Sequence, residues 1–262
     1  MNVLSFFQHR NRYSIRSRTG RIGFLALVLS GSLSLAAPEL RLQENFDSGE
    51  IRIPGAIVRT ASFVDDDRGG KALDLEESDI ALPMESYFDW RGGTLEFRIK
   101  YSADPKRLYR DSHRILHATG NPDRKYADAY LNSFSLIHGW GRGLFVLFGD
   151  SETRHQLVFA ESNTWKAEQW MHVAITWSTG TAETLELRIY VDGRLAGQYR
   201  GAFRPDAEAW NQAATHPARP AIDRCMRIGS QGTNRVPVVL DDLRIYPFPR
   251  TYYYLTPHLE AP

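Results

Sequence analysis

TLEFRIKY, residues 94–101, alternates apolar and polar side chains without a break. This period of two is typical of a β-strand with one face in a core and the other in water. The same alternation recurs in HVAITW, residues 172–177, and in LELRIYV, residues 185–191. Asp192 and Gly193 follow directly and favour the positive φ angles of a tight turn, so we expect the chain to fold back as a hairpin there.

Other segments also fit an all-β chain. Residues 144–148 are apolar throughout, which predicts a strand covered on both faces. Residues 102–132 hold two prolines and many charges and predict long loops around a short strand at 115–118. Residues 204–224 predict a further loop with one helical turn at 206–213. Many short strands joined by Gly and Asp turns favour an antiparallel two-sheet sandwich whose functional residues lie in the long loops.

A series of short motifs points to a known family. They are GKALDL at 70–75, TLEFRIK at 94–100, WMHVAITW at 170–177, LRIYVDGR at 187–194, IGS at 228–230 and LDDLRIY at 240–246. The series resembles a laminin-G-like domain of the concanavalin A-like lectin/glucanase superfamily over about residues 42–246. It implies a two-sheet jelly roll, which we expect to cover residues 37–248, followed by a tail at 249–262. This fold hosts lectins, carbohydrate-binding modules, glycosidases, lyases and adhesion modules, so the resemblance does not fix an activity.

Charge is divided unevenly along the chain. The sequence has 32 Lys and Arg and 31 Asp and Glu, but five of the arginines precede Glu39, the first acidic residue. The chain from Glu39 onward therefore has 27 basic and 31 acidic residues, a net charge of −4. Such a surface argues against non-specific binding of nucleic acid, which needs clustered Lys and Arg. Cys225 is the only cysteine, which excludes an internal disulfide and a cysteine-based zinc cluster.

The first 36 residues have the pattern of a signal peptide. An arginine-rich stretch ends at Arg21, an apolar run of 14 residues covers 22–35, and small residues follow, so we expect cleavage after Ala36. The run is shorter than the roughly 20 residues that cross a bilayer, so no membrane span is expected after cleavage, and an uncleaved anchor is the alternative. No Asn-x-Ser/Thr acceptor occurs, which favours an exported bacterial protein, periplasmic or extracellular.

Paired carboxylates are one sign of an enzyme. Glycosidases of this superfamily that resemble family 16 glycoside hydrolases carry Glu-x-Asp-x-(x)-Glu on one strand, because a retaining mechanism needs two carboxyl groups roughly 5 Å apart. Asp74, Glu76 and Glu77 come nearest to this spacing, and the alternative is an ordinary solvated charge run. A polysaccharide lyase would instead need Tyr, His and Arg. Residues that could supply these groups are Tyr126, Tyr130, His138 and Arg142.

His172 lies in an alternating strand that also contains Trp170 and Trp177. In the family that the chain resembles, Trp-x-His-Val forms a structural strand. We therefore interpret His172 as a hydrogen-bonded packing residue and both tryptophans as core residues. The sequence has no Ser-His-Asp signature, no glycine-rich phosphate loop and no His-x-x-x-His pair. Nucleotide, zinc and serine-hydrolase chemistry therefore lack support.

Asp241 is the candidate metal ligand. It shares strand parity with Leu243 and should point to the core, where an unpaired carboxylate is costly. Either a bulge turns it outward, or backbone donors or a cation satisfy it. The resemblance implies a structural calcium ion, held by this Asp and by backbone carbonyls of Gly69 or Gly70 and of residues 44–47, which are all hard oxygen ligands.

Flat aromatic rings beside polar side chains are typical of sugar sites. HGWGRG, residues 138–143, fits best, because its glycines let a ligand approach the backbone beside His138, Trp140 and Arg142. Trp165 and Trp210 are further exposed candidates, and Trp140 and Trp210 could instead pack in the structure. The leading interpretation is an exported, non-catalytic module that binds a polysaccharide or glycoconjugate. Its alternatives are a polysaccharide lyase or glycosidase with an atypical site, and a structural or adhesion module that binds protein.

Overall fold

The computed structural model describes residues 40–105, 113–119, 132–139, 143–151, 156–161, 165–180, 183–215, 225–229, 235 and 237–251. The predicted signal peptide and most of the predicted tail lie outside these residues. Within them, no helix has both the length and the apolar character needed to cross a bilayer.

Thirteen strands and two helices make up the described part of the chain. They are β1 (Leu42–Glu44), β2 (Ile57–Asp65), β3 (Lys71–Pro83), α1 (Met84–Tyr87), β4 (Gly92–Tyr101), β5 (His113–Thr119), β6 (Ser133–Gly139), β7 (Gly143–Gly149), β8 (Gln156–Glu161), β9 (Trp170–Thr179), β10 (Thr184–Val191), β11 (Arg194–Ala202), α2 (Ala207–Thr215), β12 (Cys225–Gly229) and β13 (Val238–Tyr246). Neighbouring strands pair antiparallel throughout. The prediction of an all-β antiparallel fold is confirmed.

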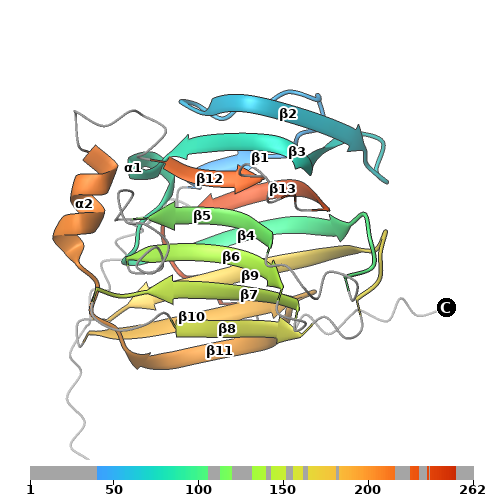
Figure 1. The fold of residues 1–262 in the computed structure, drawn as a ribbon. Helices are drawn as coiled ribbons and strands as arrows, with labels where there is room; N and C mark the ends of the chain where they lie inside the picture. The colour runs from blue at the N-terminus through green and yellow to red at the C-terminus, as the bar shows by residue number, and fades with distance from the viewer. Residues whose placement is uncertain are drawn as a thin grey trace, which may run out of the picture. The chain divides into compact units, whose positions relative to one another are not determined.

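One curved sheet forms both layers of the domain (Figure 1). The strand order β11-β10-β9-β4-β13-β3 continues as β12-β5-β6-β7-β8, so β3 belongs to both layers. The first half of β3 pairs with β13 at Leu73 and Asp74, and its second half pairs with β12 from Asp79 to Pro83. The two expected sheets are therefore two layers of one hydrogen-bonded sheet.

The core lies between these layers. Trp177 of β9 contacts Phe134 of β6 from the opposite layer, with ring centroids 5.1 Å apart. The alternating residues Phe97 and Val173 are at most 1% exposed. All residues of β6 and β7 are buried, which confirms that 144–148 are covered on both faces.

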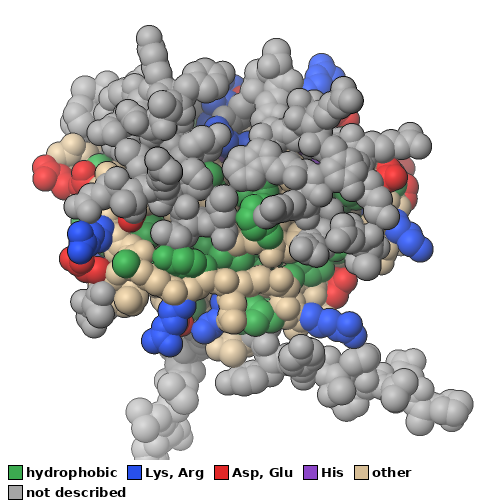
Figure 2. All heavy atoms as spheres, turned by 60° about the horizontal axis from the view of Figure 1, so that its bottom comes forward, with side chains coloured by type: hydrophobic (Ala, Val, Ile, Leu, Met, Phe, Trp, Pro, Cys, Tyr) green, Lys and Arg blue, Asp and Glu red, His purple; other side chains and the backbone are tan. Residues whose placement is uncertain are grey.

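The open edge of the sheet closes where β11 meets β8. At Gly197 of β11, a Cβ atom would lie 2.2 Å from the carbonyl oxygen of Phe159 in β8, so only glycine permits this approach. Figure 2 looks onto this side of the domain, where hydrophobic side chains lie among the strand backbones and charged side chains surround them.

A hairpin turn and a helix complete the fold. Asp192 and Gly193 join β10 to β11 with φ angles of 49° and 73°, as predicted. α2 begins after Asp206, whose Oδ1 accepts the N–H of Ala209 at 2.9 Å. At nine residues α2 is longer than the single turn expected. It lies beside α1 at one end of the sandwich (Figure 1).

Candidate functional site

His138 lies inside the sandwich. It is 2% exposed and packs against Tyr101 of β4, with ring centroids 4.9 Å apart. Neither ring nitrogen has a hydrogen-bond partner among the described residues. Burial, together with the neighbouring His113, lowers the pKa of His138 to about 4, so the imidazole is neutral at neutral pH. A ligand at the surface does not reach this side chain.

The expectation of an exposed ring is wrong for Trp165, which is 7% exposed, and also for Trp210, which is a core residue. It is 1% exposed and packs against Phe88 and Phe148, with ring centroids 5.4 and 6.5 Å away. The reason is that α2 lies across the end of the sandwich and turns this side chain inward. The ring cannot serve as an exposed stacking surface.

The remaining predicted residues fall into two groups. Outside the described residues lie Tyr126, Tyr130, Trp140 and Arg142, which stay predictions. Asp74 is described, and its Oδ1 accepts the backbone N–H of Glu76 at 3.0 Å. This local bond agrees with an ordinary strand and turn at that position.

A hollow opens beside α1 and α2. Its apolar wall is made of Met84, Phe88, Trp90 and Trp210. Its polar residues are Arg41, Glu85, Asp89, Arg91, Asn211 and Thr215. The Trp90 side chain is half-buried and packs against the rim of the core. Hydrogen-bond donors and acceptors thus flank an aromatic surface.

Asp89 organises the charges of this hollow. Nε of Arg91 donates to its carboxylate at 2.9 Å, and a guanidinium nitrogen of Arg41 lies 3.6 Å from it. Burial raises the pKa of Asp89, but the two guanidinium groups outweigh burial and hold that pKa below its usual value. The backbone carbonyl of Asp89 accepts the indole N–H of Trp177 at 2.8 Å, which ties the loop to the core. Asp89 is therefore ionised and ion-paired at neutral pH.

A β-bulge in β13 decides where Asp241 lies. The register with β4 shifts between Asp241 and Arg244, and Asp242 in between has a φ of 50°. Leu240 faces the core before the bulge and Leu243 after it, so strand parity inverts there. The expectation that Asp241 points to the core because it shares parity with Leu243 is therefore wrong. The bulge, which was the stated alternative, places Asp241 on the outer face.

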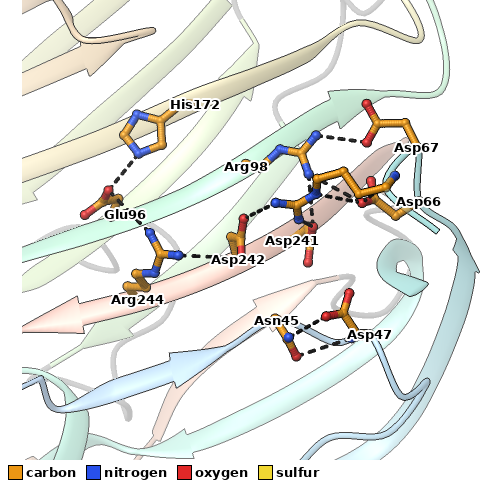
Figure 3. Close-up of polar contacts among 11 residues, drawn as sticks. Asn45, Asp47, Asp66, Asp67, Glu96, Arg98, His172, Asp241, Asp242 and Arg244 are labelled. Carbon is orange, nitrogen blue, oxygen red and sulfur yellow. Dashed lines mark hydrogen bonds and ion pairs between the residues drawn. The ribbon is translucent and has the colours of Figure 1, made fainter. Parts of the chain in front are cut away.

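Two arginines cover Asp241 on that face (Figure 3). Arg68 contacts its Oδ2, and Arg98 Nη1 lies 3.3 Å from the same atom, so Asp241 is fully buried. Burial raises the pKa of Asp241 to about 6. Burial also acts to raise the pKa of Asp66, but hydrogen bonds with Arg68 and Asp67 lower it to about 2. Both carboxylates are ionised at neutral pH.

The implied calcium ion can be tested against this arrangement. The Asp241 carboxylate is already bound by two guanidinium groups, and the Gly70 carbonyl accepts the N–H of Asp66 at 3.0 Å. In the described part of the chain, no three His, Cys, Asp or Glu residues are grouped so that they could hold a metal ion. The residues as arranged do not fit a calcium ion, which stays a prediction from the resemblance.

His172 occupies the structural place predicted for it. Its Nε2 lies 2.8 Å from Oε1 of Glu96, a mostly buried carboxylate. Trp177 is in the core as expected. Trp170 instead lies on the outer face, half-buried, with the Arg98 guanidinium 4.5 Å from its ring centre.

Sequence reasoning missed Trp90 and Arg68. Trp90 follows α1 in the short loop before β4, and its position between Asp89 and Arg91 was the available signal. Arg68 follows three consecutive aspartates, residues 65–67. That charge run could have identified a cation able to meet a buried carboxylate.

Comparison with known proteins agrees with this architecture. A family model described as the concanavalin A-like lectin/glucanases superfamily matches residues 76–252. The chain belongs to this superfamily. Among the described residues, a hollow lined by aromatic side chains lies at one end of the sandwich, beside α1 and α2.

Solved structures of this superfamily's fold are similar at low identity. Domain 4 of the arabinanase AbnA from Geobacillus stearothermophilus, solved with arabinotriose, is 16% identical with a TM-score of 0.51, over 80% of this chain and 92% of that one. The binding domain of botulinum neurotoxin DC, solved with SialylT, is 13% identical with a TM-score of 0.51, over 74% of this chain and 43% of that one. The receptor-binding domain of botulinum neurotoxin mosaic serotype C/D is 14% identical with a TM-score of 0.47, over 75% of this chain and 44% of that one. The chain thus spans less than half of these toxin domains, and no curated protein matches it.

Proposed function

We propose that this domain is an exported, non-catalytic module that binds a carbohydrate or glycoconjugate in the hollow beside α1 and α2. The observation that carries the proposal is the half-buried ring of Trp90, which borders the hollow among charged and amide side chains. A flat ring covers the apolar face of a sugar, and polar neighbours bind its hydroxyl groups.

The polar residues suit binding better than proton transfer. A general acid must carry a proton at the working pH, whereas the guanidinium groups of Arg41 and Arg91 keep Asp89 ionised. The same arginines present further N–H donors, and Asn211 adds an amide to the lining of the hollow. Such groups bind hydroxyl oxygens without changing their own protonation state.

The similar solved structures also bear on the class of ligand. The arabinanase domain and the neurotoxin domain were solved with arabinotriose and SialylT. Those ligands belong to those proteins, and for this chain they support only the class of ligand.

A glycan array followed by affinity measurements tests the proposal. Trp90→Ala should weaken binding of the glycan found by about tenfold, because loss of aromatic stacking is worth about 1 to 1.5 kcal/mol. Trp170→Ala is the matched control, since Trp170 is also half-buried but borders a different surface. It should leave glycan affinity unchanged.

Trp140→Ala tests the loop predicted from sequence in the same assay. If Trp140→Ala loses glycan affinity and Trp90→Ala does not, the binding site lies in the predicted loop and not in the hollow. Release of reducing ends or unsaturated products from a polysaccharide would contradict a non-catalytic role.

Export is tested separately. Mass spectrometry of the exported protein should find Ala37 as its first residue. A cell-bound product that retains Arg21 would favour an anchor instead.

A further inference from the structure

A cluster of carboxylates lies where the loop before β3 meets β13 (Figure 3). The side chains of Asp66 and Asp241 are fully buried, and that of Asp242 is 18% exposed. One cation reaches all three. Arg68 donates from Nε to Asp66 at 3.0 Å, from Nη1 to Asp242 at 2.8 Å and from Nη2 to Asp241.

Arg98 assists from β4 but cannot replace Arg68. Its Nη1 lies 3.3 Å from Asp241 and 3.5 Å from Asp66, and its Nη2 donates to Asp67 at 3.0 Å. The guanidinium is held over the ring of Trp170. Of these two arginines in the described part of the chain, Arg68 is the one that also pairs with Asp242, the residue at the centre of the bulge in β13.

We propose that Arg68 is a built-in cation that stands in place of the calcium ion that the resemblance implies, so that the domain is stable without calcium. Buried carboxylates are costly unless a positive group meets them. A guanidinium offers five donors in a planar fork and binds several carboxylates at once. Arg68 also lies two residues from Gly70, next to the carbonyls that the resemblance assigns to calcium, and so supplies the positive charge from the chain itself.

Removing Arg68 would leave carboxylate oxygens without their cation. Oδ1 of Asp66 and Oδ1 of Asp241 are buried and have no hydrogen-bond partner among the described residues. Arg68 contacts Oδ2 of Asp66, Asp241 and Asp242, so without it these three oxygens would lose their shared cation, and Arg98 alone would remain beside the excess negative charge. Carboxylate oxygens are the ligands that calcium prefers. Arg68→Ala should therefore convert a calcium-independent domain into a calcium-responsive one.

Thermal unfolding with and without calcium tests this proposal. The unchanged protein should melt at the same temperature in excess chelator and in millimolar calcium. Arg68→Ala should melt on the order of 10 °C lower in chelator, because a buried ion-pair cluster has lost its cation. Calcium should raise the melting temperature of this variant in a concentration-dependent way.

Two further variants serve as controls. Arg68→Lys keeps the positive charge but loses the planar guanidinium. Its melting temperature should lie between those of the unchanged protein and Arg68→Ala, and calcium should not raise it. Arg52→Ala removes an arginine whose partner Glu50 is exposed, and should change the melting temperature little. If Arg68→Ala does not fold in chelator, refolding it in calcium gives the same information.

Three outcomes would overturn the proposal. A calcium-dependent melting temperature of the unchanged protein would place a metal ion in the native cluster. If Arg68→Ala is as stable as the unchanged protein, Arg68 does not stabilise the carboxylate cluster. A destabilised Arg68→Ala protein without calcium response, and without calcium binding by titration calorimetry, would refute the claim that Arg68 stands in place of an ion.

Discussion

Lowering the pH from 7 to 4.5 is expected to destabilise the domain through His138. Burial gives this imidazole a folded-state pKa of about 4, against 6.5 for an ordinary histidine. Between these two values the unfolded chain binds more protons than the folded chain, so the free energy of unfolding falls as the pH falls. The difference between the two pKa values corresponds to about 3 kcal/mol, and about 2 to 3 kcal/mol is lost by pH 4.5.

The total pH dependence does not isolate His138, because other groups contribute. The pKa of Asp241 is raised to about 6 by burial, so its contribution runs the other way and favours the folded state on acidification. The pKa of Asp66 is about 2, and the stability it provides is lost only below about pH 4. The pKa of His117 is lowered to about 3 by burial and by Arg114 and Arg227, so it adds to the effect of His138.

His138→Leu separates these contributions, since it removes one titrating group and leaves the others in place. Urea unfolding of both proteins at pH 7 and pH 4.5 gives the loss of unfolding free energy for each. The unchanged protein should lose about 2 to 3 kcal/mol more than His138→Leu, whatever the variant's stability at pH 7. Equal losses in the two proteins would refute the assignment of a buried, neutral His138.

Two mutations test the packing at two places in the domain. Trp210→Ala should cost about 3 to 5 kcal/mol in chemical unfolding, the range for large core side chains, whereas the exposed neighbour Asn211→Ala should stay within about 0.5 kcal/mol. A stable Trp210→Ala protein would contradict its place in the core. Gly197→Ala should lower the melting temperature, since its Cβ would overlap the carbonyl of Phe159. Ala196→Ser, at an exposed neighbouring position of β11, should not lower it. Equal melting temperatures would contradict the close approach of β11 and β8.

The strands were predictable because their signal is local. Alternation in residues 94–101 and 185–191 sets which side chains face the core, and Asp192 with Gly193 sets the hairpin between β10 and β11. Uninterrupted apolar sequence at 144–148 likewise predicted a strand buried on both faces. None of these inferences depends on residues far away in the sequence.

The site was less predictable because its features depend on single departures from local rules. One bulged residue, Asp242, inverts the parity of β13 and moves Asp241 to the other face. Trp210 is buried because α2 crosses the end of the sandwich, which no periodicity in that loop reveals. Arg68 meets Asp241 across 173 residues of sequence, and only the folded chain brings them together.

Occupied surfaces explain why binding is proposed at the end of the sandwich. On the outer face of β4 and β9, Glu96 is paired with His172 at 2.8 Å and with Arg250 at 2.7 Å, and Arg98 lies over Trp170. In the other layer, β6 and β7 are buried on both faces. These side chains and strands are thus already engaged in ion pairs or in packing. The half-buried ring of Trp90 borders a hollow beyond the strand ends, where a ligand could cover it without displacing an interaction that holds the two layers together.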